Sequence, residues 1–338
     1  MPFQKAEENM SKVLTVVIPS YNVEQFLEKT VQSFLDEEIL DDIEILIVND
    51  GSKDQTKEIG LEFEKKYPQS VKLVDKENGG HGSTINKGLL LATGKYFKVV
   101  DGDDWVDTRA FVSYVKHLKT LDVDMVFTPF NEVYIPSMRM VKRATANVQT
   151  NKVYVLSDVL ADMGDCYQMH GITFRTDLIK NKLKITEKCF YVDQEYILLP
   201  LKDVKNVIFL DYTIYQYRLG DVNQSVSVTS KQKNREMHKK VVMRLLHEFE
   251  TEKDELTKEQ IAFLKQRLTG LVYTQLDIYF SMGNVYEEFK FFWEAVKAAS
   301  QDIYKDMSGF TANMIKCSKK LGYAVGTKRL QKKLNIQA

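Results

Sequence analysis

The run KVVDGDDWVD, from Lys98 to Asp107, contains the side chains of this chain that are best suited to chemistry. Asp101, Asp103 and Asp104 surround Gly102 directly after a short apolar strand pattern. Carboxylates crowded at the end of a buried strand repel one another and lose hydration unless a cation or hydrogen-bond donors compensate them. A divalent metal ion that holds a diphosphate would supply this compensation. The alternative is a strand that ends in an Asp-Gly turn and binds nothing.

The elements around this run alternate between strand and helix over the first third of the chain. Runs of β-branched and apolar residues predict strands, and apolar residues at helical spacing predict the helices between them. This alternation is typical of an α/β fold with a mostly parallel sheet that helices cover on both faces. The predicted strands span residues 12–22, 43–52, 70–77 and 94–100, and the predicted helices span residues 23–38, 53–67 and 83–93.

Polar clusters follow three of the predicted strands, at residues 20–22, 49–52 and 101–104. Ligands of parallel sheets bind at the carboxyl ends of the strands, which lie along one edge. One polar strand end would be an ordinary loop, whereas three in the same sheet predict one shared site.

Composition limits the class of protein. The 47 basic and 47 acidic residues give a formal charge of zero, which argues against a nucleic-acid partner. The three cysteines are far apart and lack metal-binding spacing, as expected in a reducing compartment. The start of the chain is polar, and no run of about 18 apolar residues is present that could span a bilayer. We therefore expect a cytoplasmic protein.

Two regions are expected in the 338 residues. Residues 1–230 contain the strand and helix alternation and two later strand patterns, MVFTPFNEVYI (125–135) and VIFLDYTIYQYR (207–218). From residue 231 the sequence is helical, with few turn signals before Gly283. Residues 231–338 are therefore predicted to form a C-terminal helical region.

Several segments together resemble the inverting family 2 glycosyltransferases of the GT-A fold. The resemblance covers about residues 12–230, and it depends on the order and spacing of the set, because each short motif also occurs by chance. The matching segments are VVIPSYN (16–22), ILIVNDGSKDQT (45–56), ENGGHGSTINKG (77–88), GKYFKVVDGDDWV (94–106), FYVDQEY (190–196) and YRLGDVNQSVS (217–227).

The resemblance implies a Rossmann-like GT-A catalytic domain and an enzyme that uses a UDP-sugar donor. A hexose or N-acetylhexosamine would pass to a hydroxyl of a glycan acceptor, which is a polysaccharide or is linked to lipid or protein. The implied setting is the assembly of bacterial cell-surface polysaccharide. Homo-oligomerisation stays open.

The acidic run matches the Asp-x-Asp motif of the family. The resemblance makes Asp103 the first choice for binding Mn²⁺ or Mg²⁺, with Asp101 near the ribose or a metal-bound water. Hard oxygen ligands beside a diphosphate suit these ions. Gly102 would provide room, and Asp104 is expected to be structural.

The nucleotide is expected at the other strand ends. The resemblance implies that Asp50 accepts the N3–H of uracil, while Pro19 positions the adjacent turn and Tyr21 stacks on the base. Helix capping is the alternative for Asp50, and simple packing is the alternative for Tyr21. The same region makes Asp54 a candidate helix cap.

The glycine-rich segment 77–88 would line the nucleotide-sugar pocket, because glycines permit close backbone approach and a helix N-terminus favours anions. Gly80 and His81 are the candidate contacts there, and an ordinary loop histidine is the alternative for His81. In segment 217–227, which resembles a loop that closes over the donor, Arg218 could pair with phosphate oxygens.

Asp193 aligns with the aspartate that acts as general base in relatives. Many relatives have Glu-Asp where this chain has Val192-Asp193, so the preceding carboxylate is missing. Glu195 is the fallback base, and one of these two acids is expected to have a structural partner. His170 is a further candidate near the acceptor, with a structural histidine as its alternative.

Two other classes of function and one further surface stay open at this point. A nucleotidyltransferase would share the sheet and an acidic metal site, but the turn after the first strand lacks the basic glycine-rich loop of such enzymes. A non-catalytic nucleotide-sugar-binding protein is the third hypothesis. The basic tail 314–338 is a candidate for peripheral contact with the inner face of the membrane, or a solvated helix.

Overall fold

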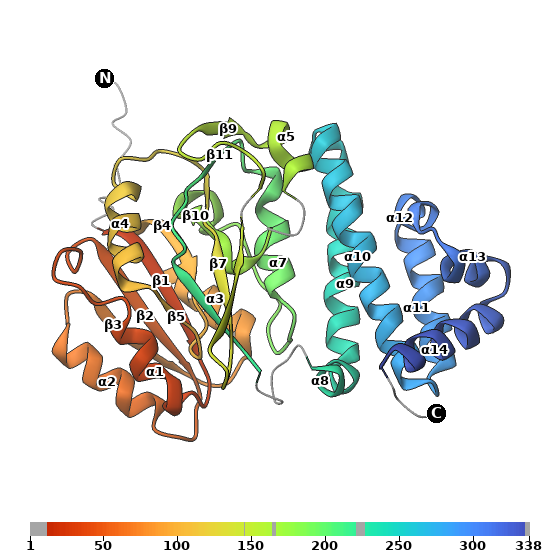
Figure 1. The fold of residues 1–338 in the computed structure, drawn as a ribbon, viewed down its shortest axis with the longest axis horizontal. Coiled ribbons are helices and arrows are strands. Elements are labelled where there is room, and N and C mark those ends of the chain that lie inside the picture. Colours follow the sequence, from red (N-terminus) through yellow and green to blue (C-terminus); the bar gives the residue numbers. More distant parts are fainter. Residues whose placement is uncertain (1–11, 145, 164–166, 221–226, 335–338) are drawn as a thin grey trace. The chain divides into compact units, whose positions relative to one another are not determined.

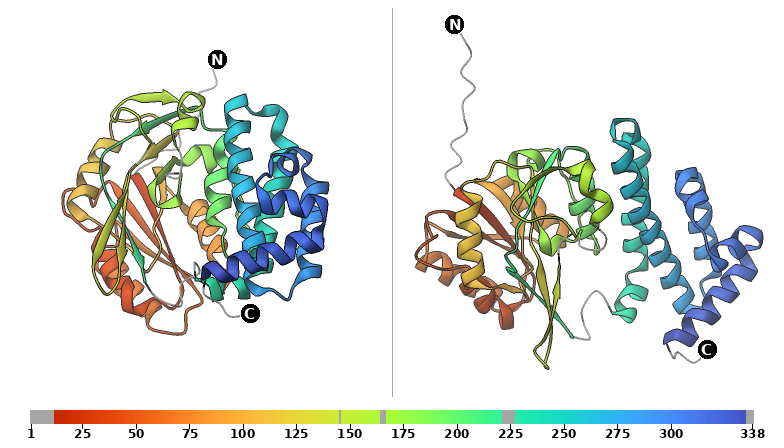
Figure 2. Two further views of the ribbon diagram at one scale, coloured as in Figure 1. Left: turned by 45° about the vertical axis from the view of Figure 1, so that its right-hand side comes forward. Right: turned by 45° about the horizontal axis from the view of Figure 1, so that its top comes forward.

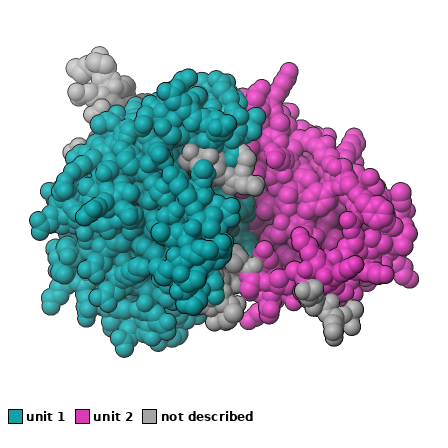
Figure 3. Space-filling view, viewed as in Figure 1, with its two compact units in different colours: residues 1–220 teal, residues 221–338 magenta. Residues whose placement is uncertain are grey.

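The computed structural model describes residues 12–144, 146–163, 167–220 and 227–334. The chain divides into two compact units, residues 1–220 and 221–338 (Figure 3). The composition change that the sequence places at residues 230–231 falls inside helix α8 (Val228–Lys233), which belongs to the second unit.

The first unit contains an eight-stranded sheet in the order β3-β2-β1-β4-β10-β6-β11-β9 (Figure 1). Strands β3, β2, β1 and β4 pair in parallel, whereas β10 is antiparallel to both of its neighbours. The predicted α/β class and the mostly parallel arrangement around the strand ends are confirmed. The strands are β1 (Lys12–Ser20), β2 (Ile43–Asp50), β3 (Val71–Lys76), β4 (Gly94–Val99), β6 (Met125–Phe127), β9 (Val153–Val155), β10 (Ile172–Arg175) and β11 (Asn206–Phe209).

Helices cover both faces of this sheet, which is why its central strands are apolar throughout. Val16 and Ile18 of β1 belong to a buried cluster with Leu27 of α1 and Tyr114 of α4. Val17 points to the opposite face, where Gly88 of α3 lies against it. The helices of this unit are α1 (Glu24–Gln32), α2 (Thr56–Lys66), α3 (His81–Leu91), α4 (Thr108–Leu118), α5 (Leu156–Val159), α6 (Thr176–Ile179) and α7 (Asp193–Leu198), with short 3₁₀ turns η1 (Leu160–Asp162), η3 (Met169–Gly171) and η4 (Leu199–Lys202).

A second sheet has the strand order β5-β12-β7-β8. Each of the two later strand patterns of the sequence divides between the sheets: the first gives β6 and β7, and the second gives β11 and β12. Pro129 separates β6 from β7, because proline cannot donate to a sheet ladder. The strands are β5 (Trp105–Val106), β7 (Phe130–Tyr134), β8 (Arg139–Arg143) and β12 (Tyr215–Leu219).

The second unit is helical. Helix α10 packs against α9 along one side and against α14 on another (Figures 1 and 2). Thr257 and Gln260 form a reciprocal capping box at the start of α10, and Gly283 ends this helix in a left-handed conformation. The remaining elements are α9 (Arg235–Glu252), η5 (Lys253–Glu255), α10 (Lys258–Met282), α11 (Tyr286–Ala299), α12 (Gln301–Asp306), α13 (Phe310–Cys317) and α14 (Lys319–Leu334).

Within the described parts of both units, every helix is too short or too polar to cross a lipid bilayer.

Candidate functional site

The acidic turn, residues 101–104, lies beside the end of β1. Because β1 pairs in parallel with both β2 and β4, the carboxyl ends of the three strands lie along one edge of the sheet. The backbone N–H of Gly102 donates to the carbonyl oxygen of Pro19 at 3.1 Å. A Cβ at position 102 would lie 2.8 Å from that oxygen, so this close approach requires glycine.

Asp104 ties the acidic turn to β12. One carboxylate oxygen accepts the backbone N–H of Arg218 at 2.7 Å, and the other accepts the hydroxyl of Tyr215 at 2.6 Å. Burial, together with the charges of Asp103 and Asp101, raises the pKa of Asp104 well above its usual value. The structural role expected for Asp104 therefore has specific partners, and they come from a strand more than a hundred residues away.

Asp101 pairs with His81, the first residue of α3. Nε2 of His81 lies 2.8 Å from Oδ1 of Asp101. Burial lowers the pKa of His81, but the carboxylates of Asp101, Asp193 and Asp103 outweigh burial, so the pKa is raised overall. Burial acts to raise the pKa of Asp101, but His81 outweighs it and lowers that pKa. Both shifts favour the ion pair, which fixes the start of α3 against the acidic turn.

The protein environment also disfavours the charged form of the Asp103 carboxylate. Burial first, and then the charge of Asp101, raises its pKa to about 6. The side chain of Arg218 donates through Nε to the backbone carbonyl of Asp103 at 2.7 Å. The carboxylate of Asp103 thus lies close to several charges and stays costly to ionise without an added cation.

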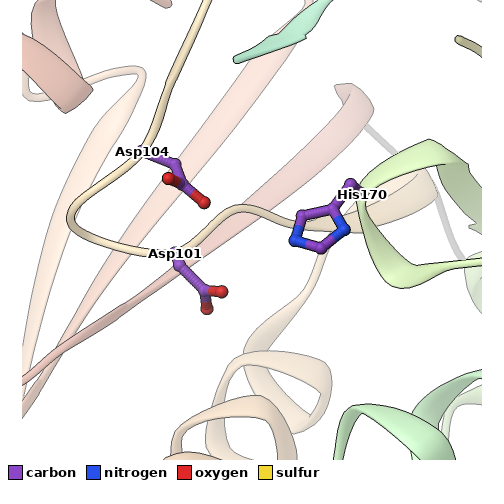
Figure 4. A group of neighbouring side chains, drawn as sticks. All are labelled: Asp101, Asp104 and His170. Carbon is purple, nitrogen blue, oxygen red and sulfur yellow. The ribbon is translucent and has the colours of Figure 1, made fainter. Parts of the chain in front are cut away.

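Asp101, Asp104 and His170 could together hold a metal ion. One potential ligand atom from each lies within 4.8 Å of the other two, and Figure 4 shows the side chains of Asp104 and His170 directed toward each other with Asp101 beside them. Burial lowers the pKa of His170 to about 4, so the ring is neutral and able to act as a ligand. Its Nδ1 is buried and has no hydrogen-bond partner in the described chain. Two carboxylates and an imidazole fit a divalent ion such as Mn²⁺.

Lys98 lies inside β4 and is completely buried. Its ammonium group donates to the backbone carbonyls of His170 at 2.9 Å and Ile172 at 3.2 Å. Burial lowers the pKa of Lys98 to about 7. Sequence reasoning missed this residue, and the available signal was a lysine in an otherwise apolar strand. Lys98 holds the turn that carries His170.

Asp50 ends β2 and organises the glycine-rich loop, residues 77–82. Its Oδ1 accepts hydrogen bonds from Lys76 at 2.6 Å and from the backbone N–H of Gly79 at 2.8 Å. Its Oδ2 accepts the backbone N–H of Gly80 at 2.8 Å. Asp50 is 2% exposed, so the protein itself supplies most of its hydrogen-bond donors. Asp54, the candidate cap, lies one residue before the N-cap position of α2 and accepts the backbone N–H groups of Thr56 and Glu24, the first residues of α2 and α1.

The glycine-rich loop packs against residues 185–189. A Cβ at Gly82 would lie 2.2 Å from the carbonyl oxygen of Thr186, and Gly80 has φ +79° with the backbone of Lys188 close by. The backbone N–H of Lys188 donates to the carbonyl of Gly79 at 2.6 Å. Two glycines of the predicted pocket loop are therefore required by packing.

The two acids of the FYVDQEY segment occupy different environments. Glu195 is fully buried and accepts two hydrogen bonds from Thr186, from the backbone N–H at 2.7 Å and from the hydroxyl at 2.8 Å. Asp193, the first residue of α7, interacts electrostatically with His81 and Asp101. Burial raises its pKa, and Gln194 donates to its Oδ2 at 2.8 Å. Glu195 thus has the structural partner that the sequence expects for one of the pair.

Aromatic and cationic side chains flank the acidic turn. Trp105 has the ammonium group of Lys29 at 3.3 Å and the guanidinium of Arg218 at 5.1 Å from its ring centre. Tyr21 is 52% exposed, which leaves its ring accessible to a ligand. Segment 217–227 is expected to close over the donor, and its residues 221–226 lie outside the described part of the chain.

The fold and site define a class of protein, the GT-A type of α/β domain followed by a helical region. The solved structure of TarS residues 1–349 from S. aureus, in complex with UDP-GlcNAc, superposes with a TM-score of 0.64 at 16% identity. The match covers 95% of this chain and 92% of that chain. Residues 15–177 match the family model described as glycosyl transferase family 2. This part of the chain thus matches the family that the resemblance predicts.

Two relatives from Bacillus subtilis are similar in sequence to this chain. EpsJ, named as an uncharacterized glycosyltransferase, is 28% identical over 217 residues, or 62% of this chain and 62% of the relative. GgaB, named as a minor teichoic acid biosynthesis protein, is 32% identical over 234 residues, or 67% of this chain and 25% of the relative. The matched part of the chain thus spans less than two thirds of either relative.

Proposed function

We propose that this protein is a metal-dependent, inverting glycosyltransferase that moves a hexose or N-acetylhexosamine from a UDP-sugar to a hydroxyl of a glycan acceptor. The observation that carries the proposal is the grouping of Asp193 with His81 and the carboxylates of the acidic turn. A base and an anion-stabilising region must lie on either side of the reacting carbon for an in-line displacement.

Asp193 is the proposed general base. Its raised pKa, caused mainly by burial, makes the carboxylate a better proton acceptor near neutral pH. A lone pair of the acceptor oxygen attacks the anomeric carbon as its proton passes to Asp193, and the bond to the UDP oxygen breaks. Glu195 is unsuitable for this step because Thr186 occupies its carboxylate.

The residues proposed to bind the donor lie at the ends of β1 and β2 and on β12 beside the acidic turn. Tyr21 offers an exposed ring for the uracil, and Asp50 is the proposed acceptor for its N3–H, in addition to its role in the glycine-rich loop. Arg218 lies beside the acidic turn and supplies positive charge for the diphosphate.

Mn²⁺ or Mg²⁺ is proposed as the cofactor, and a bound ion would neutralise charge on the leaving diphosphate. Asp103 and Asp101 are the proposed holders, with His170 and Asp104 as the further ligand set that the structure adds. His81 keeps Asp101 ionised through their charged pair.

The names of the relatives support the donor and the setting. The TarS complex contains UDP-GlcNAc, and GgaB is named for teichoic acid biosynthesis. We therefore propose an acceptor among bacterial surface glycans, either as free polymer or linked to lipid or protein.

The test uses purified protein, a panel of UDP-sugars, glycan acceptors and Mn²⁺. We expect UDP as a product, and Asp193→Asn should lower kcat by about 10³-fold or more while leaving the melting temperature unchanged. Glu195→Gln is the matched control, and it should lower the melting temperature instead. Full activity of Asp193→Asn, or release of pyrophosphate in place of UDP, would refute the proposal.

A further inference from the structure

The C-terminal segment of the second unit concentrates positive charge. Residues 309–334 contain no Asp or Glu and seven basic residues, which give a formal charge of +7. Because the whole chain has a formal charge of zero, the remainder has −7. The basic residues are Lys316, Lys319, Lys320, Lys328, Arg329, Lys332 and Lys333.

Helix α14 is fixed so that one basic face points to solvent. A Cβ at Gly322 would lie 2.5 Å from the backbone nitrogen of Ile315, and one at Gly326 would lie 2.7 Å from the ring of Phe280. These two glycines therefore define the packed face of the helix. The opposite face, at helical spacing, carries the exposed residues Lys320, Leu321, Ala324, Lys328 and Lys332.

The charges of this basic face are not compensated within the described protein. Of the seven basic residues, Lys319 forms an ion pair with Glu294 at 2.5 Å, and Lys333 interacts electrostatically with Asp277. Lys316 donates to the backbone carbonyls of Lys305 and Met307. Lys320, Lys328 and Lys332 form no ion pair with a described residue, so their charges are directed to water.

Exposed apolar side chains lie on the same two helices as these charges. Phe310, the first residue of α13, is 63% exposed, and Leu321 is 54% exposed. The guanidinium of Arg329 lies 5.5 Å from the ring centre of Phe310. An aromatic ring and a leucine next to cations match the headgroup region of a bilayer, where apolar groups meet anionic phosphates.

We propose that α13 and α14 form a docking surface for a membrane that contains anionic phospholipids. Electrostatic attraction provides most of the binding, and Phe310 and Leu321 insert among the headgroups. A soluble polyanionic glycan would satisfy the lysines but would leave both apolar side chains without a partner, so the lipid surface fits better. The docking does not depend on the transfer reaction.

The experiment is flotation of the full chain with vesicles of phosphatidylcholine, with or without phosphatidylglycerol. We expect binding to the anionic vesicles alone, and weaker binding as salt rises. The variant K320E/K328E/K332E should lose binding by about fivefold or more for each residue changed. The matched control K240E/K258E/K305E changes three exposed lysines of the same unit by the same charge, and it should still bind.

A second variant, F310S/L321S, tests insertion while keeping every charge. It should bind anionic vesicles more weakly than the unchanged protein but keep the dependence on salt. Circular dichroism of each variant verifies that the helices are intact. Absence of flotation for the unchanged protein, equal loss in both lysine variants, or binding to a soluble polyanion without binding to vesicles would overturn the proposal.

Discussion

The carboxylates at the ends of β2 and β4 lie at the same edge of one sheet but differ in how far the protein compensates their charge. Asp50 accepts hydrogen bonds from Lys76 and from the amides of Gly79 and Gly80, so its charge is compensated by the protein. The acidic turn places three carboxylates together, and burial raises the pKa of Asp103 and Asp104. The comparison teaches that Asp50 builds the site, whereas the acidic turn leaves charge for a ligand to compensate.

The largest expected effect is on turnover. Asp101→Asn and Asp103→Asn should each lower kcat by about 10²–10³-fold, because the metal ion proposed to neutralise the leaving diphosphate would lose a carboxylate ligand. Asp107→Asn is the control from the same segment, since Asp107 caps α4 and asparagine caps equally well. Initial rates with saturating Mn²⁺ measure the effect. If Asp107→Asn lowered kcat as much as the other two variants, the acidic turn would have no special role in turnover.

The second effect is on stability. Asp50→Asn should lower the free energy of unfolding by about 2–4 kcal/mol, because it removes a buried charge from Lys76 and weakens two amide contacts. Asp75→Asn, at an ion pair with Lys57 that is 42–47% exposed, should cost less than about 1 kcal/mol. Urea denaturation of both variants makes the measurement. If Asp50→Asn were as stable as Asp75→Asn, Asp50 would not be a scaffold residue.

The third effect is a gain in the free energy of unfolding, and it depends on pH. The pKa of Asp103 is about 6 in the folded chain and 3.8 ordinarily, so the folded chain keeps a proton that the unfolded chain has lost between these values. The free energy of unfolding therefore falls as pH rises through this window. Asp103→Asn should be more stable at pH 7 by about 1–2 kcal/mol without divalent metal.

This gain should disappear below about pH 4, where the carboxyl is protonated in both states. Urea denaturation at both pH values, with a chelator present, provides the measurement. A loss of stability at pH 7 would mean that Asp103 is compensated in the way that Asp50 is.

The smallest expected effect is the change in stability on removing the Ser83 hydroxyl beside Asp50. Ser83 lies 3.3 Å from Asp50 but donates at 2.7 Å to the carbonyl of Gly80, so its hydroxyl contributes little to the carboxylate. Ser83→Ala should therefore cost about 1 kcal/mol or less. Thermal unfolding measures this change in stability. A larger loss would mean that the Ser83 hydroxyl compensates part of the charge of Asp50.

The strand ends could be predicted from the sequence because parallel pairing puts them at one edge. That rule brings the ends of β1, β2 and β4 together without any knowledge of side-chain contacts. The close backbone approach at Gly102 could also be anticipated, because an Asp-Gly sequence is typical of a turn.

The remaining contacts depend on long-range pairing that no local pattern encodes. Asp104 meets Tyr215 and Arg218 because β5 and β12 pair in the second sheet. Lys98 can be buried because the carbonyl groups of His170 and Ile172 receive its ammonium group, and these lie 72 and 74 residues away. A charged residue in an apolar strand signals such a partner but does not identify it.

The packing of residues 185–189 has a mechanical consequence. This segment is held on one side by Gly79, Gly80 and Gly82, and on the other by the bonds from Thr186 to Glu195, two residues beyond Asp193. Residues 185–189 therefore connect the glycine-rich loop to α7, which begins at Asp193, through close contacts on both sides. If Asp193 and the glycine-rich loop contact the substrate as proposed, this fixed spacing limits the size of the sugar that fits between them.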